Sequence, residues 1–176
     1  VPPTSNANYG WILNMVSKLS VNGVAGFILA NGALSADGTE GAIRQKMIER
    51  GLVEAIVILP RNLFYSTDIS VTLWILNANK KAHVINRNGE EIHYRDREKE
   101  ILFMDMRQMG EPFEKKYVRF TDEDIRKVAD TYHNWQRKGH TDTYTDIPEF
   151  CKSVKIDEEG GIADKGFSLV PSKYIE

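Results

Sequence analysis

The chain has 176 residues and a formal net charge of −2 at pH 7, a length that suits one domain of ordinary size or part of a larger one. The near-neutral charge argues against an autonomous nucleic-acid-binding domain, which usually carries a basic patch. A single cysteine, Cys151, excludes an internal disulfide framework and fits a reducing compartment. No apolar stretch reaches membrane-spanning length and no signal peptide opens the chain, so we expect a cytoplasmic protein with no membrane partner.

A helix and then a strand–helix–strand unit are expected at the start of the chain. An apolar stripe that includes Trp11 predicts a helix over about residues 9–19. Residues 24–29 and 54–59 are almost continuously apolar, which is typical of strands covered on both faces. The crossover between them, with a predicted helix near residues 39–50, is long enough to make the two strands parallel neighbours.

The next apolar run, residues 70–76, is expected to turn back. The loop before it, residues 60–69, holds no helix and is too short for another crossover, so the third strand should be antiparallel. Two doubly covered strands also need neighbours on both sides and helices on both faces. We therefore expect the sheet to continue in polypeptide outside this chain, or against a second copy.

Beyond residue 79 the pattern becomes more polar. Two short runs flank Asn88-Gly89, which predicts a β-hairpin in an added segment, residues 80–99. Residues 101–105 read as one more strand.

The clearest helix of the chain is predicted to begin at Thr121. Asp124 stands at the reciprocal position of a capping box, and an apolar side continues until residue 138. The tail from residue 140 is expected to be polar and irregular, with two short apolar pieces.

Two loops mark the sheet edge where ligands gather in open α/β folds, the carboxyl ends of the parallel strands. The first, residues 30–38, contains Asn31 and Gly32 and runs into a helix N-terminus that would suit an anion. A tight strand-to-helix connection explains this loop equally simply, and the residues alone favour that interpretation.

The second loop, residues 60–69, carries Arg61 and the adjacent aromatic residues Phe64 and Tyr65. An enzyme that modifies a nucleobase takes the base out of the duplex and holds it against an aromatic face. Without further evidence, the residues favour a role in capping the core.

Other chemistry is poorly represented. The four histidines show no metal-ligand spacing with Cys151 or with one another, so we expect no metal site. Cys151 has no histidine neighbour in the sequence that would take up its proton, so we expect no nucleophile role for it. No phosphate-binding glycine motif and no nucleophile elbow is present.

Eight blocks of residues, in a fixed order across nearly the whole chain, carry a family resemblance. They are Pro-Pro-Thr-Ser-Asn-Ala-Asn-Tyr-Gly-Trp at 2–11, Gly-Phe-Ile-Leu-Ala-Asn-Gly at 26–32, Glu-Gly-x-Ile-Arg at 40–44, Leu-Pro-x-x-Leu-Phe-Tyr-x-Thr-x-Ile at 59–69, Leu-Phe-Met-Asp at 102–105, Phe-Thr-Asp-Glu-Asp-Ile at 120–125, Ala-Asp-Thr-Tyr-His-x-Trp at 129–135 and Pro-x-Phe-Cys-Lys-Ser at 148–153. With these blocks the chain resembles the M (modification) subunits of type I restriction–modification systems, which are adenine-N6 DNA methyltransferases.

The resemblance also implies what this chain lacks. Family members carry an N-terminal helical region, a glycine-rich S-adenosylmethionine motif and an Asn-Pro-Pro-Phe catalytic motif upstream of these blocks, and none of these occurs here. The chain therefore resembles the C-terminal part of such a subunit, inactive by itself, with a partial Rossmann-like class I methyltransferase sheet and a helical, irregular C-terminal region. The implied division is the end of the catalytic domain (1–78), a hairpin insertion with a further strand (79–119), and a helix with a partner-docking tail (120–176).

The resemblance implies a site and partners. The parent enzyme would pass a methyl group from S-adenosylmethionine to an adenine flipped out of double-stranded DNA. Phe64, and Tyr65 as second choice, would stack on that base. Asn31 and Gly32 would line the cleft, and Arg61 would contact the DNA backbone. No catalytic residue and no metal ligand is expected in this chain, and the partners would be a specificity (S) subunit and a restriction (R) subunit.

Two other functions remain open. In the first, the chain is a non-catalytic interaction module that docks a specificity subunit through the helix at 121–138 and the tail at 144–174. A solitary adenine methyltransferase that reads DNA itself is a further alternative, and the near-neutral charge counts against it.

Overall fold

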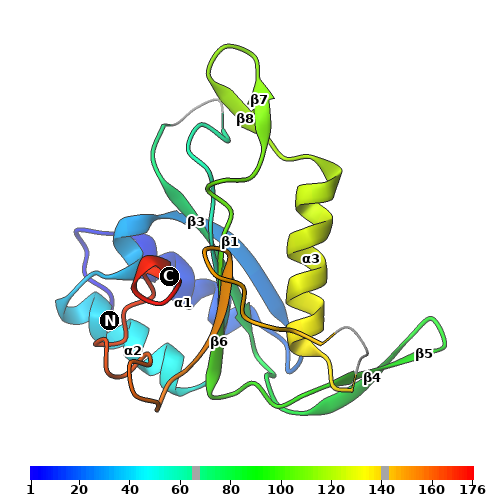
Figure 1. Cartoon of the computed structure of the whole chain (residues 1–176). Coiled ribbons are helices and arrows are strands. Elements are labelled where there is room, and N and C mark those ends of the chain that lie inside the picture. The colour runs from blue at the N-terminus through cyan, green and yellow to red at the C-terminus, as the bar shows by residue number, and fades with distance from the viewer. Residues whose placement is uncertain (65–67, 140–142) are drawn as a thin grey trace.

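The computed structural model describes residues 1–64, 68–139 and 143–176. Within these ranges a five-stranded sheet, with strand order β1-β3-β2-β6-β9, forms the centre of the molecule (Figure 1). Its strands are β1 (Val24–Ala30), β2 (Val53–Ile58), β3 (Val71–Asn77), β6 (Glu100–Asp105) and β9 (Cys151–Lys155). Strands β2 and β6 pair in parallel, and the other pairs are antiparallel. The predicted α/β class, with parallel strands and a reversed strand, is confirmed.

Strand β3 lies between β1 and β2. Trp74 of β3 pairs with Phe27 on one side and with Ile56 on the other, antiparallel in both cases. The reversed direction of this strand is as predicted. The prediction that β1 and β2 are neighbours is wrong, although they run in the same direction. Because the crossover that contains α2 (Gly38–Glu49) spans two strand positions, the returning strand fills the gap and satisfies the backbone groups of both.

Helices cover the two faces of the sheet. On one face α1 (Asn8–Lys18) and α2 pack over a core that includes Ile12, Ile48 and Trp74. On the other face α3 (Asp122–Gln136) packs over a core that includes Val57 and Trp135 (Figure 1). Strand β2, buried along its whole length, matches the prediction of a doubly covered strand. Trp11 was expected on the buried stripe of α1, but 62% of its surface is exposed, because Tyr9 and Ile12 form the inner side of this helix.

Strand β1 is an uncovered edge. Its side chains alternate between half-buried and exposed, and Val24 and Ile28 are 56% and 44% exposed. The prediction that both faces of this strand are covered fails within the described residues, because α3 packs over β2 and β6 and does not bury β1. An exposed apolar face on an unpaired edge is unusual for a finished sheet.

Two hairpins extend from the sheet. The predicted one, β4 (His83–Arg87) with β5 (Glu90–Tyr94), is confirmed, and it turns through Asn88 and Gly89, which both have positive φ. The second, β7 (Glu111–Phe113) with β8 (Tyr117–Arg119), was not predicted. It projects beyond the end of the sheet, above the start of α3 (Figure 1).

The C-terminal segment is more ordered than its sequence suggested. Strand β9 pairs antiparallel with β6, where the sequence predicted an irregular tail. Lys152, Ser153 and Lys155 are polar because β9 is an edge strand. A short 3₁₀ helix, η2 (Pro171–Lys173), follows, and the ring of Tyr174 stacks on Phe103 at 4.6 Å between centroids. In the ranges described, no helix is both long enough and apolar enough to cross a bilayer.

Candidate functional site

The two loops singled out in the sequence follow the carboxyl ends of β1 and β2. They leave the same end of the sheet, because the two strands run in the same direction. The loop after β1 forms a 3₁₀ helix, η1 (Asn31–Leu34), whose Ala33 and Leu34 are buried. Asn31 is held in place: its side-chain oxygen accepts a hydrogen bond from the Thr72 hydroxyl of β3. Gly32 is exposed, with open space around its Cα. This loop is therefore ordered, with Asn31 fixed against β3 and the following two apolar residues buried.

The N-terminus of α2, which follows this loop, has acidic side chains of its own. Asp37 is the N-cap residue, whereas the sequence predicted Thr39, which lies inside the first turn together with Glu40. Negative side chains at a helix N-terminus take the place that a bound anion would otherwise occupy. The geometry favours a strand-to-helix connection over an anion site here.

Within its described residues, the loop after β2 presents the ring of Phe64 at the carboxyl end of the strand. Leu59 is buried, and Phe64 is 37% exposed. Arg61 is exposed, and its guanidinium lies 3.6 Å from the Asp68 carboxylate. Tyr65, the second predicted stacking residue, lies outside the described residues.

Phe64 lines an apolar pocket of about 480 Å³. The floor comes from the sheet, through Ile28 and Leu73, and the walls come from Phe64 and the β7–β8 hairpin. Asn31 and Gly32 are not among its lining residues, so the structure does not bring the two predicted groups of site residues into one pocket. The full set lining it is Ile28, Leu59, Leu63, Phe64, Leu73, Phe113, Tyr117, Val118, Arg119 and Phe120.

Sequence reasoning missed the aromatic side chains that the hairpin adds to this pocket, Phe113 and Tyr117. The signal was available: aromatic residues recur at positions 113, 117 and 120 around the charged turn Glu-Lys-Lys. Such alternation of apolar and charged residues is typical of a short hairpin with one packed face.

A second hollow, of about 450 Å³, lies between the loop and the hairpin and is lined by Arg61, Arg107 and Gly110, among others. Arg107 makes a two-pronged contact with Asp105, with Nε 3.1 Å from both carboxylate oxygens and Nη2 2.6 Å from one. Both arginines at this edge therefore have carboxylate partners on the protein.

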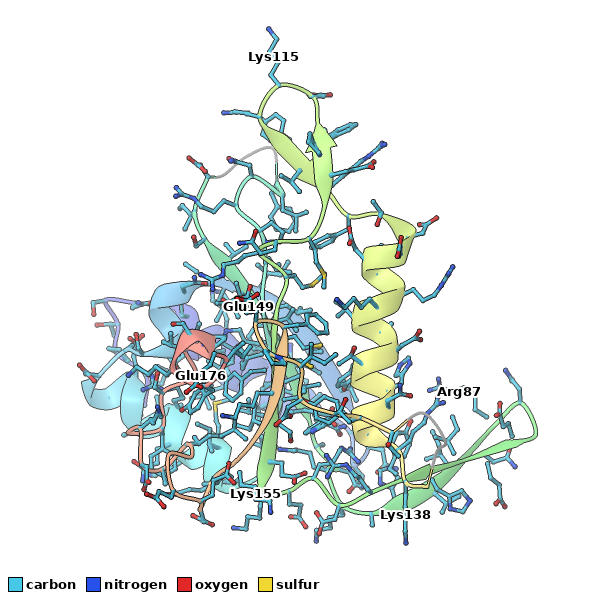
Figure 2. The ribbon with its side chains drawn as sticks, in the orientation of Figure 1. Arg87, Lys115, Lys138, Glu149, Lys155 and Glu176 are labelled. Atoms are coloured by element: carbon cyan, nitrogen blue, oxygen red, sulfur yellow. The ribbon has the colours of Figure 1, made fainter. Side chains whose placement is uncertain are left out.

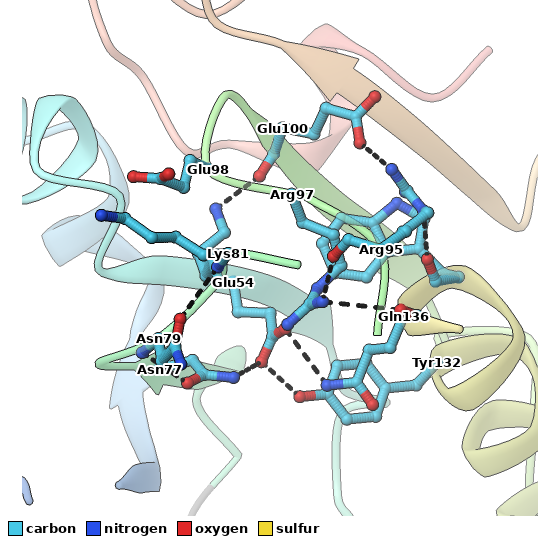
Figure 3. Close-up of polar contacts among 12 residues, drawn as sticks. Glu54, Asn77, Asn79, Lys81, Arg95, Arg97, Glu98, Glu100, Tyr132 and Gln136 are labelled. Atoms are coloured by element: carbon cyan, nitrogen blue, oxygen red, sulfur yellow. Dashed lines mark hydrogen bonds and ion pairs between the residues drawn. The ribbon is translucent and has the colours of Figure 1, made fainter. Parts of the chain in front are cut away.

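A buried polar cluster occupies the opposite end of β2 (Figure 3). The fully buried Glu54 accepts hydrogen bonds from Asn77 (2.9 Å), Arg97 (3.0 Å), Tyr132 (2.6 Å) and Gln136 (3.1 Å). Burial and the neighbouring Glu54 raise the pKa of Tyr132 above its usual range. This cluster joins α3 and the segment before β6 to the central strand, far from the loops described above, so its role is structural.

Lys80 is buried beside this cluster. Its ammonium donates hydrogen bonds to the carbonyl oxygens of Val53 and Glu100. Burial lowers the pKa of Lys80 to about 7, against a weaker opposing effect of Glu54. In the segments described here, no group of three or more His, Cys, Asp or Glu side chains is placed to hold a metal ion.

Comparison with known proteins places this fold in a class. The family model described as "N-6 DNA Methylase" matches residues 1–176, so the chain belongs to the N-6 DNA methylase family. It is 40% identical over 175 residues to the type I restriction enzyme HindI methylase subunit of Haemophilus influenzae, covering 99% of this chain and 35% of that protein. It is 34% identical to the MjaIX methylase subunit of Methanocaldococcus jannaschii, covering 99% of this chain and 28% of that protein.

Solved structures agree. The methyltransferase subunit of a type I restriction–modification system from Streptococcus thermophilus matches with a TM-score of 0.77 and 25% identity, over 99% of this chain and 31% of that one. The EcoKI M protein shares the fold, with a TM-score of 0.57 and 21% identity, over 79% of this chain and 28% of that one. The predicted kinship with type I modification subunits is confirmed. The chain spans about a third of the length of the curated relatives it matches.

Proposed function

We propose that this chain is the C-terminal part of the modification subunit of a type I restriction–modification system. In this proposal the complete subunit transfers a methyl group from S-adenosylmethionine to adenine N6 in double-stranded DNA. The observation that carries it is identity of 40% over 99% of the chain to a type I methylase subunit of which the chain covers only 35%.

The uncovered strand β1 supports the proposal that the rest of the subunit packs against this chain. Val24 and Ile28 are exposed apolar side chains on an unpaired edge. A further strand at this edge, and chain over the exposed face, would bury them. This agrees with the expectation that the sheet continues outside residues 1–176.

The apolar pocket that Phe64 lines does not fit S-adenosylmethionine. The cofactor has ribose hydroxyls and a charged amino group that need polar acceptors, whereas the pocket at the sheet edge has no carboxylate among its lining residues. We therefore assign cofactor binding and the methyl-transfer chemistry to the remainder of the subunit. This chain by itself is proposed to be inactive.

The part of the reaction proposed for this chain is to hold the substrate. Phe64 would stack on the flipped adenine, since its ring is partly exposed and lines the apolar pocket at the carboxyl end of β2. Base–aromatic stacking contributes about 1–3 kcal/mol per base, which offsets much of the cost of unstacking. Tyr65 is the second candidate, Asn31 and Gly32 would line the cleft, and Arg61 would exchange Asp68 for a DNA phosphate.

The test is methylation by the complete subunit assembled with its specificity subunit. The complex is incubated with labelled S-adenosylmethionine and genomic DNA from a host that lacks the system, and the DNA is then digested to nucleosides. Label in N6-methyladenine is the expected result. Absence of label from adenine, or label in cytosine, contradicts the proposal.

A second role, docking of the specificity and restriction subunits, is supported by exposed apolar residues away from this edge. Ile125 on α3 and Ile147 before β9 are both exposed. The test is Ile125→Asp in the complete subunit, which should weaken co-purification with the specificity subunit, whereas Lys127→Asp on the same helix serves as the control. Equal assembly of both variants would argue against α3 as the docking element.

A further inference from the structure

The β7–β8 hairpin carries a charged tip outside the body of the molecule. Phe113 pairs with Tyr117, and the turn between them, Glu-Lys-Lys at positions 114–116, is exposed. Figure 2 shows Lys115 at the outermost point of this hairpin, pointing away from the sheet. Of the two carboxylates in the hairpin, Glu111 is paired with Arg119 at 2.6 Å. With Glu114 counted against Lys115 and Lys116, the turn carries a formal charge of +1 on a chain whose net charge is −2.

Two hydrogen bonds hold the base of the hairpin. The backbone N–H of Val118 donates to the carbonyl oxygen of Asn62, in the loop after β2, at 3.0 Å. The N–H of Gly110 donates to the Asp124 carboxylate at 3.0 Å, and the same carboxylate caps α3. Gly110 has φ +97°, and a Cβ at this position would overlap Val118, so only glycine fits this crossing. The tip is thus held beside the loop that carries Phe64, and is not a free arm.

Two aromatic rings of the hairpin make cation–π contacts beside the pocket. The Arg119 guanidinium lies 5.1 Å from the centre of the Phe113 ring, and the Lys116 ammonium lies 5.3 Å from that of Tyr117. A cation on an aromatic face keeps its charge while its position is restricted. The same two rings line the apolar pocket with Phe64. Two cationic groups therefore lie on the hairpin side of the pocket in which an extruded base is proposed to stack.

We propose that Lys115 and Lys116 bind phosphates of the DNA duplex next to the flipped adenine. This inference rests on the proposed function and assigns a backbone contact that the sequence did not single out. A two-stranded ribbon is narrow enough to lie in the major groove of B-DNA. Lysine ammonium groups bind phosphates as point charges, and every phosphate that they neutralise releases counterions from the duplex.

The experiment measures DNA affinity of the complete subunit, assembled with its specificity subunit, over a series of salt concentrations. The variant is Lys115→Gln with Lys116→Gln. Since each phosphate contact adds about 0.9 to the slope of log K against log salt, the slope should become shallower by about 1.8. The matched control is Lys138→Gln with Lys155→Gln, which removes two exposed charges far from the hairpin (Figure 2).

The outcomes separate this inference from the proposed function. A shallower slope in the tip variant, with an unchanged slope in the control, supports the hairpin contact. The hairpin proposal is overturned, and the function stands, if the wild-type complex methylates DNA and the salt dependence does not single out the tip. That is the case if both variants have the wild-type slope of log K against log salt, or if both slopes become shallower by the same amount. Loss of specificity-subunit assembly in the tip variant, with an unchanged DNA slope, would show that the tip binds protein and also overturns it. If the wild-type complex neither binds nor methylates DNA, both proposals fail.

Discussion

Single side chains carry most of the chemistry proposed here, and Phe64 is the most direct to test. Replacing it with alanine in the complete enzyme removes one stacking face for the flipped base, worth about 1–3 kcal/mol, which corresponds to about a 5- to 150-fold loss in kcat/KM. Affinity for the cofactor should not change. Steady-state methylation kinetics with calorimetry of the cofactor measure the two effects separately.

Two controls make the Phe64 result specific. Phe64→Tyr keeps an aromatic face and should retain most activity. Trp11→Ala removes another exposed aromatic side chain, on α1, which does not line the pocket, and should leave kcat/KM unchanged. Full turnover in Phe64→Ala would remove this residue from the site.

Lys80 makes the stability of the fold depend on pH. Its pKa is lowered to about 7 in the folded chain and is near 10.5 when unfolded. Between these values the unfolded chain binds more protons, so the free energy of unfolding should rise with pH, by at most about 1.4 kcal/mol per unit. Below pH 7 the lysine is protonated in both states, and its contribution to the pH dependence ends.

Urea denaturation between pH 7 and pH 9.5 measures this effect. Lys80→Met keeps the buried stem but removes the titrating group, so its stability should rise less with pH than that of the wild type. Lys81→Met changes the exposed neighbour and should behave like the wild type. The assignment fails if Lys80→Met and the wild type have parallel pH profiles.

The residues of the candidate site were only partly predictable. Phe64 and Arg61 were proposed because a loop after a buried strand is recognisable from local patterns; the structure places both on the loop after β2, and their roles stay predictions. Phe113 and Tyr117 were missed because their approach to Phe64 depends on a contact between Val118 and Asn62, which are far apart in the sequence. Spacing along the chain contains little information on such contacts.

At the level of elements, α3 anchors several parts of the molecule through its first turn. The Thr121 hydroxyl accepts a hydrogen bond from the Asp124 N–H at 3.1 Å. The Asp124 carboxylate in turn accepts hydrogen bonds from the backbone N–H groups of Thr121 and Gly110. These backbone hydrogen bonds lower the pKa of Asp124. The capping box thus fixes both the helix and the base of the β7–β8 hairpin.

Thr121→Ala should therefore destabilise the chain by about 1 kcal/mol, the usual cost of removing an N-cap side chain. Thr131→Ala on the same helix removes a hydroxyl that only bonds back to the carbonyl oxygen of Lys127, and should change stability much less. Thermal or urea unfolding compares the two. Equal effects would mean that the box adds nothing beyond side-chain packing.

Elements with a local signature were predicted well, and those defined by distant pairing were not. Asn88-Gly89 and the Thr121 box each depend on a few adjacent residues, and both are as predicted. The insertion of β3 between β1 and β2 depends on where the chain returns, and β9 depends on the free edge of β6. Alternation and apolar runs predict a strand but leave its neighbours undetermined.

For the molecule as a whole, the central expectation is that residues 1–176 do not form a complete methyltransferase site. Isothermal calorimetry of the isolated chain with S-adenosylmethionine should give no stoichiometric heat, because the apolar pocket has no carboxylate among its lining residues to bind the cofactor's hydroxyl and amino groups. The complete subunit is the positive control. Tight one-to-one binding by the isolated chain would contradict the proposed division between this part and the rest.

The division into residues 1–78, 79–119 and 120–176 stays a prediction. Strands β1 to β3 come from the first of these segments, β6 from the second and β9 from the third, and all five share one sheet. The Glu54 cluster adds side-chain bonds between the first two segments and α3. The segments therefore depend on one another for stability, whatever their separate roles.

The late position of β9 has a consequence for biosynthesis. Until Cys151–Lys155 has emerged from the ribosome, β6 has an open backbone edge, and the core around Phe103 lacks the Tyr174 ring. A nascent chain that stops early would therefore display a sticky strand to chaperones and proteases.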